Sequence, residues 1–195
     1  MADTATLTRP EATELLTTPP QILGPFYPFM HKPIETGDLT GGGQAAGPIL
    51  YLSGRVLNKA GQPVAGARVE IWQANAHGRY DHPNDENAAP LDRNFNGFAV
   101  TTTDAEGRYA FKTVRPAAYP AAPGRWRPAH IHFSVTGKTE QLVTQMYFKG
   151  EEWNEKDSWL NSSGRKDALI TDPQPVVGKE PGALAVEFDI VLMKG

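Results

Sequence analysis

Short β-type segments alternate with turn sequences through most of the chain, and this pattern constrains the fold more than any other feature. Alternating or β-rich runs are found at residues 51–58, 68–75, 98–103, 108–114, 129–137, 141–148 and 183–192. Alternation with a period of two is typical of strands that bury one face. Helical periodicity is almost absent, so we expect an all-β fold, an antiparallel two-sheet β-sandwich with long loops.

Two local expectations follow from the same pattern. The runs 98–103 and 108–114 flank the turn Asp104–Gly107 and therefore predict a β-hairpin. The charged stretch 151–170 interrupts the strands and is expected to be helical or looped.

The length of 195 residues suits a single domain of ordinary size, which we expect to span residues 1–195. Residues 1–20 are interpreted as an arm with a short helix around Pro10–Leu16. Residues 21–48 carry several prolines and glycines and are expected to form an irregular lead-in, and residues 49–195 the β-sandwich core.

Composition and charge exclude several classes of function. The net charge is −3 and no basic cluster stands out, which argues against nucleic acid and anionic membrane surfaces as partners. No cysteine is present, so any metal must be held by nitrogen and oxygen ligands. The N-terminal sequence lacks the pattern of a signal peptide and no apolar run reaches membrane-spanning length, so we expect a cytoplasmic protein.

A pair of histidines, His130 and His132, stands inside the β-type run RWRPAHIHFSV. In a strand the two side chains share one face, and Ile131 faces the other way. Adjacent imidazoles suit a protein core poorly because each needs polar partners, but they are common metal ligands. The neighbouring residues Phe133 and Val135 are apolar, which argues against a merely solvated pair.

The spacing alone leaves the remaining ligands open. A cupin-like site would need a carboxylate soon after the histidine pair and a later histidine, but Glu140 comes too late and no histidine follows His132. A facial triad of two histidines and one carboxylate, with Asp81 or Asp85 as the third ligand, is an alternative.

Several motifs in chain order resemble the intradiol ring-cleavage dioxygenase family. They are VEIWQANAHGRYDHPND, NFNGFAVTTTDAEGRYAFKTVRPAAYP, RWRPAHIHFSVTG and TQMYF. The resemblance runs from QILGPFYP at Gln21 to the closing FDIVL, and the set is most similar to the catalytic subunit of the protocatechuate 3,4-dioxygenase type. Catechol and hydroxyquinol 1,2-dioxygenases share most of these motifs.

The resemblance implies one non-haem Fe(III) per chain, held by Tyr80, Tyr119, His130 and His132. Tyr119 and His132 would be axial, and Tyr80, His130 and a hydroxide equatorial. The chemistry is consistent, because a phenol with a pKa of about 10 ionises near neutrality only beside a strongly polarising cation. Tyrosine ligation of ferric iron is also known from haem proteins.

The resemblance further implies cleavage of a catechol by O2 to a cis,cis-muconate-type product, in the catabolism of aromatic compounds. Tyr119 would leave the metal and accept a substrate proton, Arg127 would stabilise negative charge on the ring, and Gln145 would belong to the pocket. The mouth of the pocket is expected at Leu23, Gly24 and Pro25.

Two departures from the family pattern bear on substrate and assembly. Ala121 follows the Tyr-Pro pair where the protocatechuate type has a tryptophan, and the segment from Tyr119 to His130 is short, which suggests a wider pocket. The chain is expected to form a homo-oligomer or a heteromer with a related iron-free subunit.

A competing interpretation is a non-enzymatic, prealbumin-like β-sandwich that acts as a binding module. The segments Leu52–Trp72 and Thr102–Val114 resemble such modules. This alternative explains the expected sandwich but not the four spaced ligands, and iron content distinguishes the two.

Overall fold

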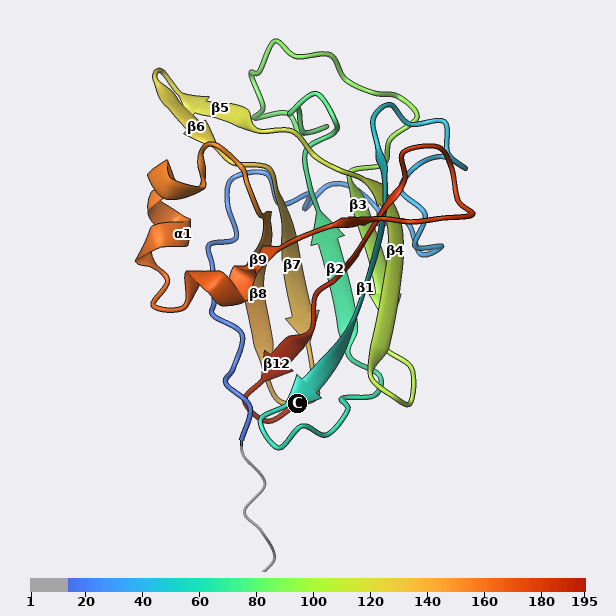
Figure 1. The fold of residues 1–195 in the computed structure, drawn as a ribbon, viewed down its shortest axis with the longest axis vertical. Helices are drawn as coiled ribbons and strands as arrows, with labels where there is room; N and C mark the ends of the chain where they lie inside the picture. The colour runs from blue at the N-terminus through green and yellow to red at the C-terminus, as the bar shows by residue number, and fades with distance from the viewer. Residues whose placement is uncertain (1–13) are drawn as a thin grey trace, which may run out of the picture.

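Two mixed β-sheets and a small projecting hairpin are built from the alternating segments (Figure 1). The computed structural model describes residues 14–195. The first sheet contains β1 (Ile49–Asn58), β4 (Arg108–Val114), β10 (Gln174–Pro175), β11 (Leu184–Glu187) and β12 (Ile190–Leu192). The second contains β2 (Arg68–Trp72), β3 (Phe98–Thr102), β7 (His130–Thr136), β8 (Gln141–Phe148) and β9 (Ile170–Thr171). The strands β5 (Tyr119–Ala122) and β6 (Arg125–Arg127) form the hairpin.

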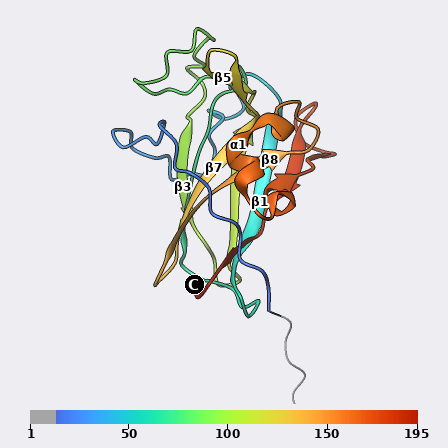
Figure 2. The same ribbon diagram turned by 90° about the vertical axis from the view of Figure 1, so that its left-hand side faces the viewer.

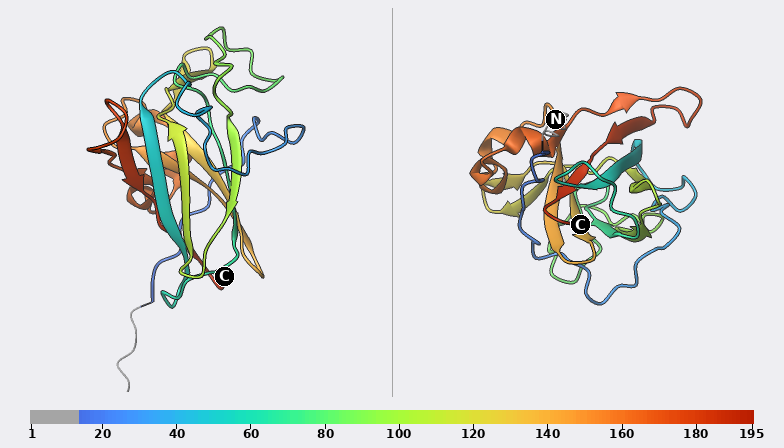
Figure 3. Two further views of the ribbon diagram at one scale, coloured as in Figure 1. Left: turned by 90° about the vertical axis from the view of Figure 1, so that its right-hand side faces the viewer. Right: turned by 90° about the horizontal axis from the view of Figure 1, so that it is seen from below.

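The inner faces of the two sheets contribute to one hydrophobic core. Leu52 and Val56 of β1 belong to the same buried cluster as Ile131 and Phe133 of β7. The ring of Phe133 lies 6.1 Å from that of Tyr109 on β4, so side chains of the two layers meet directly. Figure 3 shows the ribbon of the two layers from two further sides. The expectation of a fold made mostly of strands is therefore confirmed.

The expected antiparallel arrangement holds for most strand pairs but not for all of them. β1 pairs in parallel with β11 and β12, and β8 pairs in parallel with β9. The expected strand at 183–192 is interrupted at Phe188, whose amide donates to the Ser53 carbonyl, and at Asp189, whose carboxylate accepts from the Arg55 amide. Alternation reports which face is buried and carries no information on the direction of the partner strand.

The predicted hairpin of residues 98–103 and 108–114 is wrong. The turn is present, because the Gly107 amide donates to the Asp104 carbonyl over 3.0 Å. The strands it joins lie in different sheets, β3 beside β2 and β4 beside β1. A tight turn sets the local reversal of the chain, but the partner of each strand is chosen by long-range packing.

The charged stretch 151–170 contains three short helical elements: η1 (Asn154–Lys156), α1 (Ser158–Ser162) and η2 (Lys166–Leu169). Asp157 caps α1 by accepting the Leu160 amide hydrogen over 2.8 Å. Among the described residues, no helix has the length and apolar character needed to cross a membrane.

The N-terminal segment covers the outer face of the second sheet (Figure 2). The backbone amide of Gln21 donates to the Val143 carbonyl over 2.9 Å. The Thr144 hydroxyl donates to the Pro19 carbonyl over 2.8 Å. The helix expected around Pro10–Leu16 falls partly on residues 10–13, outside the described residues, and residues 14–16 are not helical. This covering segment encloses the outer face on which the histidine pair lies.

Candidate metal centre

The side chains of His130 and His132 point away from the hydrophobic core, as the alternation of β7 predicts. Ile131 between them is fully buried in that core. His132 lies opposite Gln145 of β8 and Trp72 of β2, and its ring stacks on the Trp72 indole at 4.7 Å and 11°. The pair is thus held on the outer face of the second sheet, beneath the N-terminal segment.

The two imidazoles meet through their Nε2 atoms, which are 3.0 Å apart. A backbone carbonyl only accepts hydrogen bonds, so His130 Nδ1 carries a hydrogen and donates it to the Pro128 oxygen over 2.7 Å. This leaves a lone pair on His130 Nε2, which faces the site. Burial, with the nearby Arg127 charge, holds the pKa of both histidines well below 6.5, so both rings are neutral at neutral pH.

Tyr80 and Tyr119 complete an aromatic cluster around the histidine pair. The Tyr80 hydroxyl lies 3.5 Å from His130 Nε2. The Tyr119 ring lies 5.5 Å from that of Tyr80 and 5.7 Å from that of His130. Burial raises the pKa of both phenols, and the Arg127 charge partly opposes this shift. The structure therefore brings the four predicted metal ligands into one buried cluster.

Contacts that sequence reasoning did not predict order the two tyrosine segments. Within the first segment, the Asp85 carboxylate accepts the hydrogen of the Tyr80 backbone amide over 2.7 Å. Between the segments, the Asn75 carbonyl accepts the hydrogen of the Ala117 backbone amide over 3.3 Å. Gly78 has a φ of 79°, and a Cβ there would collide with the Ala118 carbonyl. The glycine of the HGRY sequence thus allows the Tyr80 segment to pass directly beside the Tyr119 segment.

The carboxylates proposed for a facial triad do not join the histidines. Asp85 uses one oxygen for the Tyr80 amide and the other for the Asn87 amide, and Asp81 is exposed. Among residues 14–195, no group of three or more His, Cys, Asp and Glu side chains is arranged to hold a metal ion. A metal at the histidine pair would therefore take further ligands from the tyrosines.

The donor set fits a highly charged cation. Buried phenols with a raised pKa remain neutral unless a strong cation lies beside them, since a bound metal reverses the local effect on ionisation. Two neutral imidazoles and two phenolates would offer mixed nitrogen and oxygen donors, which ferric iron accepts. The residues present are thus consistent with the iron that the family resemblance implies.

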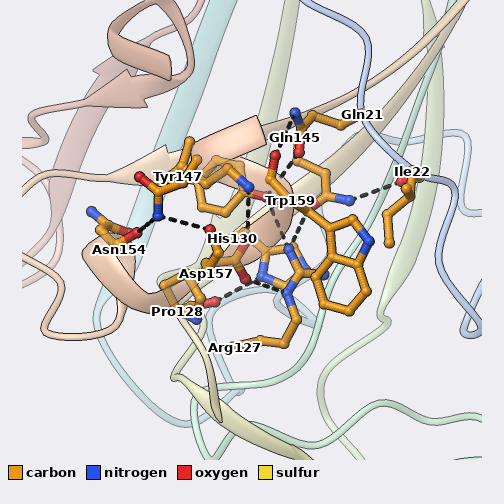
Figure 4. Close-up of polar contacts among 12 residues, drawn as sticks. Gln21, Ile22, Arg127, Pro128, His130, Gln145, Tyr147, Asn154, Asp157 and Trp159 are labelled. Carbon is orange, nitrogen blue, oxygen red and sulfur yellow. Dashed lines mark hydrogen bonds and ion pairs between the residues drawn. The ribbon is translucent and has the colours of Figure 1, made fainter. Parts of the chain in front are cut away.

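Arg127, at the end of β6, is fixed by a buried polar network, which Figure 4 shows beside His130. Its Nε lies 2.7 Å from an Asp157 carboxylate oxygen, and its Nη2 donates to Gln145 Oε1 over 2.8 Å and to the Tyr147 hydroxyl over 2.9 Å. The guanidinium also lies 4.6 Å from the Trp159 ring centroid. Sequence reasoning found Arg127 and Gln145 and missed Asp157, Tyr147 and Trp159. Aspartate is a residue type that often caps helices, which was the one available signal for Asp157.

Gln145 is fully buried, and both the nitrogen and the oxygen of its side-chain amide form hydrogen bonds with protein groups. Its Nε2 donates to the Ile22 carbonyl over 2.8 Å, and its Oε1 accepts from Arg127 and Tyr147. These contacts favour a role in which Gln145 positions Arg127 and the N-terminal segment.

The residues expected at the mouth take different positions. Pro25 lines a cavity, Leu23 packs against the aromatic cluster, and Gly24 lies against His132. The cavity has a volume of about 850 Å³, and both Tyr119 and Arg127 belong to its lining. It provides space next to Tyr119 in which an organic ligand fits.

Replacing Gly24 with alanine is expected to disturb the metal centre. Gly24 has a φ of 77°, and a Cβ there would lie 3.1 Å from His132 Cε1. The left-handed backbone conformation costs alanine roughly 1–2 kcal/mol. The close contact would also displace the ring of His132, a predicted metal ligand. Gly178→Ala is the matched control, because its φ is 80° with no atom near the added Cβ. Urea denaturation should give similar losses for the two variants, and iron content should fall only for Gly24→Ala; equal iron contents would contradict the expected contact.

The stability of the metal-free protein should fall as the pH drops below 6.5. His130 and His132 have lowered pKa values in the folded state, so the unfolded chain binds more protons in this range. We expect a loss of up to about 1.4 kcal/mol per pH unit for each histidine. Urea denaturation at several pH values measures this loss. A flat profile would contradict neutral, buried imidazoles.

Comparisons with known proteins agree with this geometry. The profile of the family described as Dioxygenase matches residues 22–194. The protocatechuate 3,4-dioxygenase beta chain of Burkholderia cepacia is 46% identical over 156 residues, covering 77% of this chain and 66% of its own length. The hydroxyquinol 1,2-dioxygenase of Nocardioides simplex is 34% identical over 197 residues, covering 88% and 63%. This chain therefore spans less than two thirds of the length of either relative.

A solved structure shows the same architecture. It is the dioxygenase domain of a dioxygenase carbohydrate-binding protein fusion from Streptomyces sp. SirexAA-E. The TM-score is 0.72 at 27% identity, with 92% of this chain and 99% of that chain covered. These matches favour an enzyme over the prealbumin-like binding module.

Proposed function

Because this chain belongs to the intradiol ring-cleavage dioxygenase family, we propose that it cleaves a catechol with O2 between the two hydroxylated carbons. The product would be of the cis,cis-muconate type. The observation that carries the proposal is the buried cluster in which two imidazole Nε2 atoms lie 3.0 Å apart, with the Tyr80 hydroxyl 3.5 Å away and the Tyr119 ring beside them.

One ferric ion per chain would be held by Tyr80, Tyr119, His130 and His132. When bound, it would lower the pKa of the catechol hydroxyls and activate the catecholate ring toward O2. The donor set supports the ferric state, since two phenolates offset much of its positive charge. Among residues 14–195, no carboxylate or third histidine joins the pair in a group that could hold a metal ion, which also supports ligation by the tyrosines.

Tyr119 and Arg127 are the protein groups placed to handle protons and charge. Both line the cavity, so both can contact a ligand there. Burial raises the pKa of the Tyr119 phenol, and a phenolate at this position would accept a proton from a catechol hydroxyl. The Arg127 guanidinium, held by Asp157 and Gln145, would stabilise negative charge that develops on the substrate ring.

The surrounding groups exclude water and keep these residues in place. The N-terminal segment closes the outer face through the Gln145–Ile22 hydrogen bond, and Gly24 lies over His132. In a dry site, the charge of Arg127 acts more strongly on a bound catecholate than it would in water.

The assembly and location of the protein stay predictions. The likeness to a chain named as a beta chain supports a heteromer with a related iron-free subunit, and a homo-oligomer is the alternative. Light scattering of the purified chain, alone and with a candidate subunit, distinguishes the two. A cytoplasmic location is checked by cell fractionation.

The visible spectrum of the iron-loaded protein, before and after anaerobic addition of catechol, tests the proposed function. We expect a broad tyrosinate-to-iron absorption band that moves to longer wavelength with catechol, followed by muconate formation when O2 is admitted. A protein that stays colourless after loading with Fe(III) would overturn the four-ligand centre and favour a binding module.

A further inference from the structure

The cavity beside the metal centre is large for a single aromatic ring. Its volume is about 850 Å³, and residues of the β5–β6 hairpin line it together with Tyr119 and Arg127. Cavities of roughly 300–1,000 Å³ typically enclose ligands of drug size. An unsubstituted catechol bound at the four rings would leave most of this space unused.

The walls that surround the unused space are mainly small or aromatic. The lining includes Ala121 and Ala122 of β5, Trp126 of β6, Trp159 of α1 and Phe26 of the N-terminal segment. Residues 84–87 add polar groups, but most of the lining residues are apolar. Because the hairpin places methyl groups where larger side chains would fill the cavity, the space next to Tyr119 stays open. Such a lining favours apolar groups of appreciable size.

The charges in the lining disfavour an anionic substituent. Of the described residues that line the cavity, Arg127 alone is positively charged, and its guanidinium already binds Asp157, Gln145 and Tyr147. Glu86 also lines the cavity, while Arg125 lies outside the lining with its guanidinium 5.8 Å from the Trp159 ring. A carboxylate placed here would lose water without gaining a free cation.

We propose that the cavity receives a bulky, neutral, apolar substituent on the catechol ring, such as an aryl group, and that Ala121 sets the size it accepts. The inference rests on the proposed function, because it places the catechol end of the ligand at the four rings. It narrows the substrate class of the site to neutral substituted catechols.

The first experiment tests which size of substituent the cavity accepts, and it measures ligand binding without turnover. Quenching of tryptophan fluorescence, measured anaerobically on the iron-loaded protein, reports ligands near Trp126 and Trp159 without turnover. 4-Phenylcatechol should bind more tightly than catechol. In Ala121→Trp, the affinity ratio of 4-phenylcatechol to catechol should fall roughly tenfold or more, equivalent to about 1.4 kcal/mol.

A matched control shows whether the change in affinity arises because the new tryptophan fills the cavity or because any added tryptophan would cause it. Ala105 is exposed in the turn between β3 and β4 and does not line the cavity, so Ala105→Trp should leave the ratio unchanged. A ratio that does not change in Ala121→Trp, or that changes equally in both variants, would overturn the inference.

The second experiment tests charge with two ligands of nearly equal shape. 3,4-Dihydroxybenzamide is neutral and protocatechuate carries a carboxylate, so the amide should bind at least as tightly as the acid. Tighter binding of the acid that is lost in Arg125→Gln would overturn the inference and identify Arg125 as a carboxylate-binding residue.

These outcomes are separable from the fate of the proposed function. If no catechol is cleaved but 4-phenylcatechol binds with the expected dependence on Ala121, the proposed activity fails and the assignment of the cavity holds. If catechol is cleaved and 4-phenylcatechol neither binds nor reacts, the activity holds and the assignment of the cavity fails.

Discussion

Replacing Tyr80 with phenylalanine is expected to lower iron content and to reduce catechol turnover by more than about 100-fold. The substitution removes the hydroxyl that lies 3.5 Å from His130 Nε2 and keeps the ring, which packs 4.6 Å from that of Phe26. The fold should therefore survive, and the free energy of unfolding of the metal-free variant should stay close to that of the parent protein. Metal analysis, the visible spectrum and single-turnover assays measure the effect.

Tyr27→Phe is the matched control for this substitution. Tyr27 packs against the same aromatic cluster, but its hydroxyl contacts Glu70 at 3.2 Å and does not belong to the proposed ligand set. Iron content and spectrum should remain those of the parent protein in this variant. If Tyr80→Phe also retains full iron and colour, the tyrosine ligation is wrong and the histidine pair must act with other ligands.

Replacing Asp157 with alanine is expected to destabilise the protein by about 3–5 kcal/mol. Arg127 is 3% exposed and Asp157 is 2% exposed, so the substitution leaves a guanidinium buried without its carboxylate. It also removes the cap of α1, because Asp157 accepts the Leu160 amide hydrogen. Urea denaturation of the parent protein and the variant gives the difference in the free energy of unfolding. The two proteins should show the same dependence of this free energy on urea concentration.

Two further variants separate the loss of the buried Asp157 charge from the loss of the helix cap and from the loss of an exposed ion pair. Asp157→Asn keeps a hydrogen-bond acceptor for the cap and removes only the charge, so most of the loss should remain. Asp172→Ala breaks the exposed pair in which Lys149 Nζ lies 2.8 Å from the Asp172 carboxylate, and it should cost far less stability than Asp157→Ala. Equal losses for Asp157→Ala and Asp172→Ala would show that the buried pair does not stabilise the fold.

The features that were predictable from the sequence are those that depend on neighbouring residues. The alternation around Ile131 places the histidines on one face and Ile131 in the core, because strand geometry has a period of two. The motifs that carry Tyr80 and Tyr119 identify the family, and the structure brings both rings to the histidine pair.

The features that were not predictable are those that depend on long-range partners. The turn Asp104–Gly107 has the sequence of a hairpin turn, yet β3 and β4 separate into different sheets, because β2 and β1 offer each of them a full antiparallel partner. Likewise, the resemblance placed Leu23–Pro25 at the mouth of the pocket, but only the structure shows that Ile22 bonds to Gln145 and that Gly24 lies on His132.

The sequence by itself therefore determined the strand-rich fold class, the family and the identity of four candidate metal ligands. Only the tertiary structure decided which strands pair, which segment covers the ligands, and which residues hold Arg127 in place. Asp157 lies 30 residues beyond Arg127 along the chain and yet 2.7 Å away in space. The free energy of such a buried contact arises from the joint packing of distant segments, which no local pattern of residues encodes.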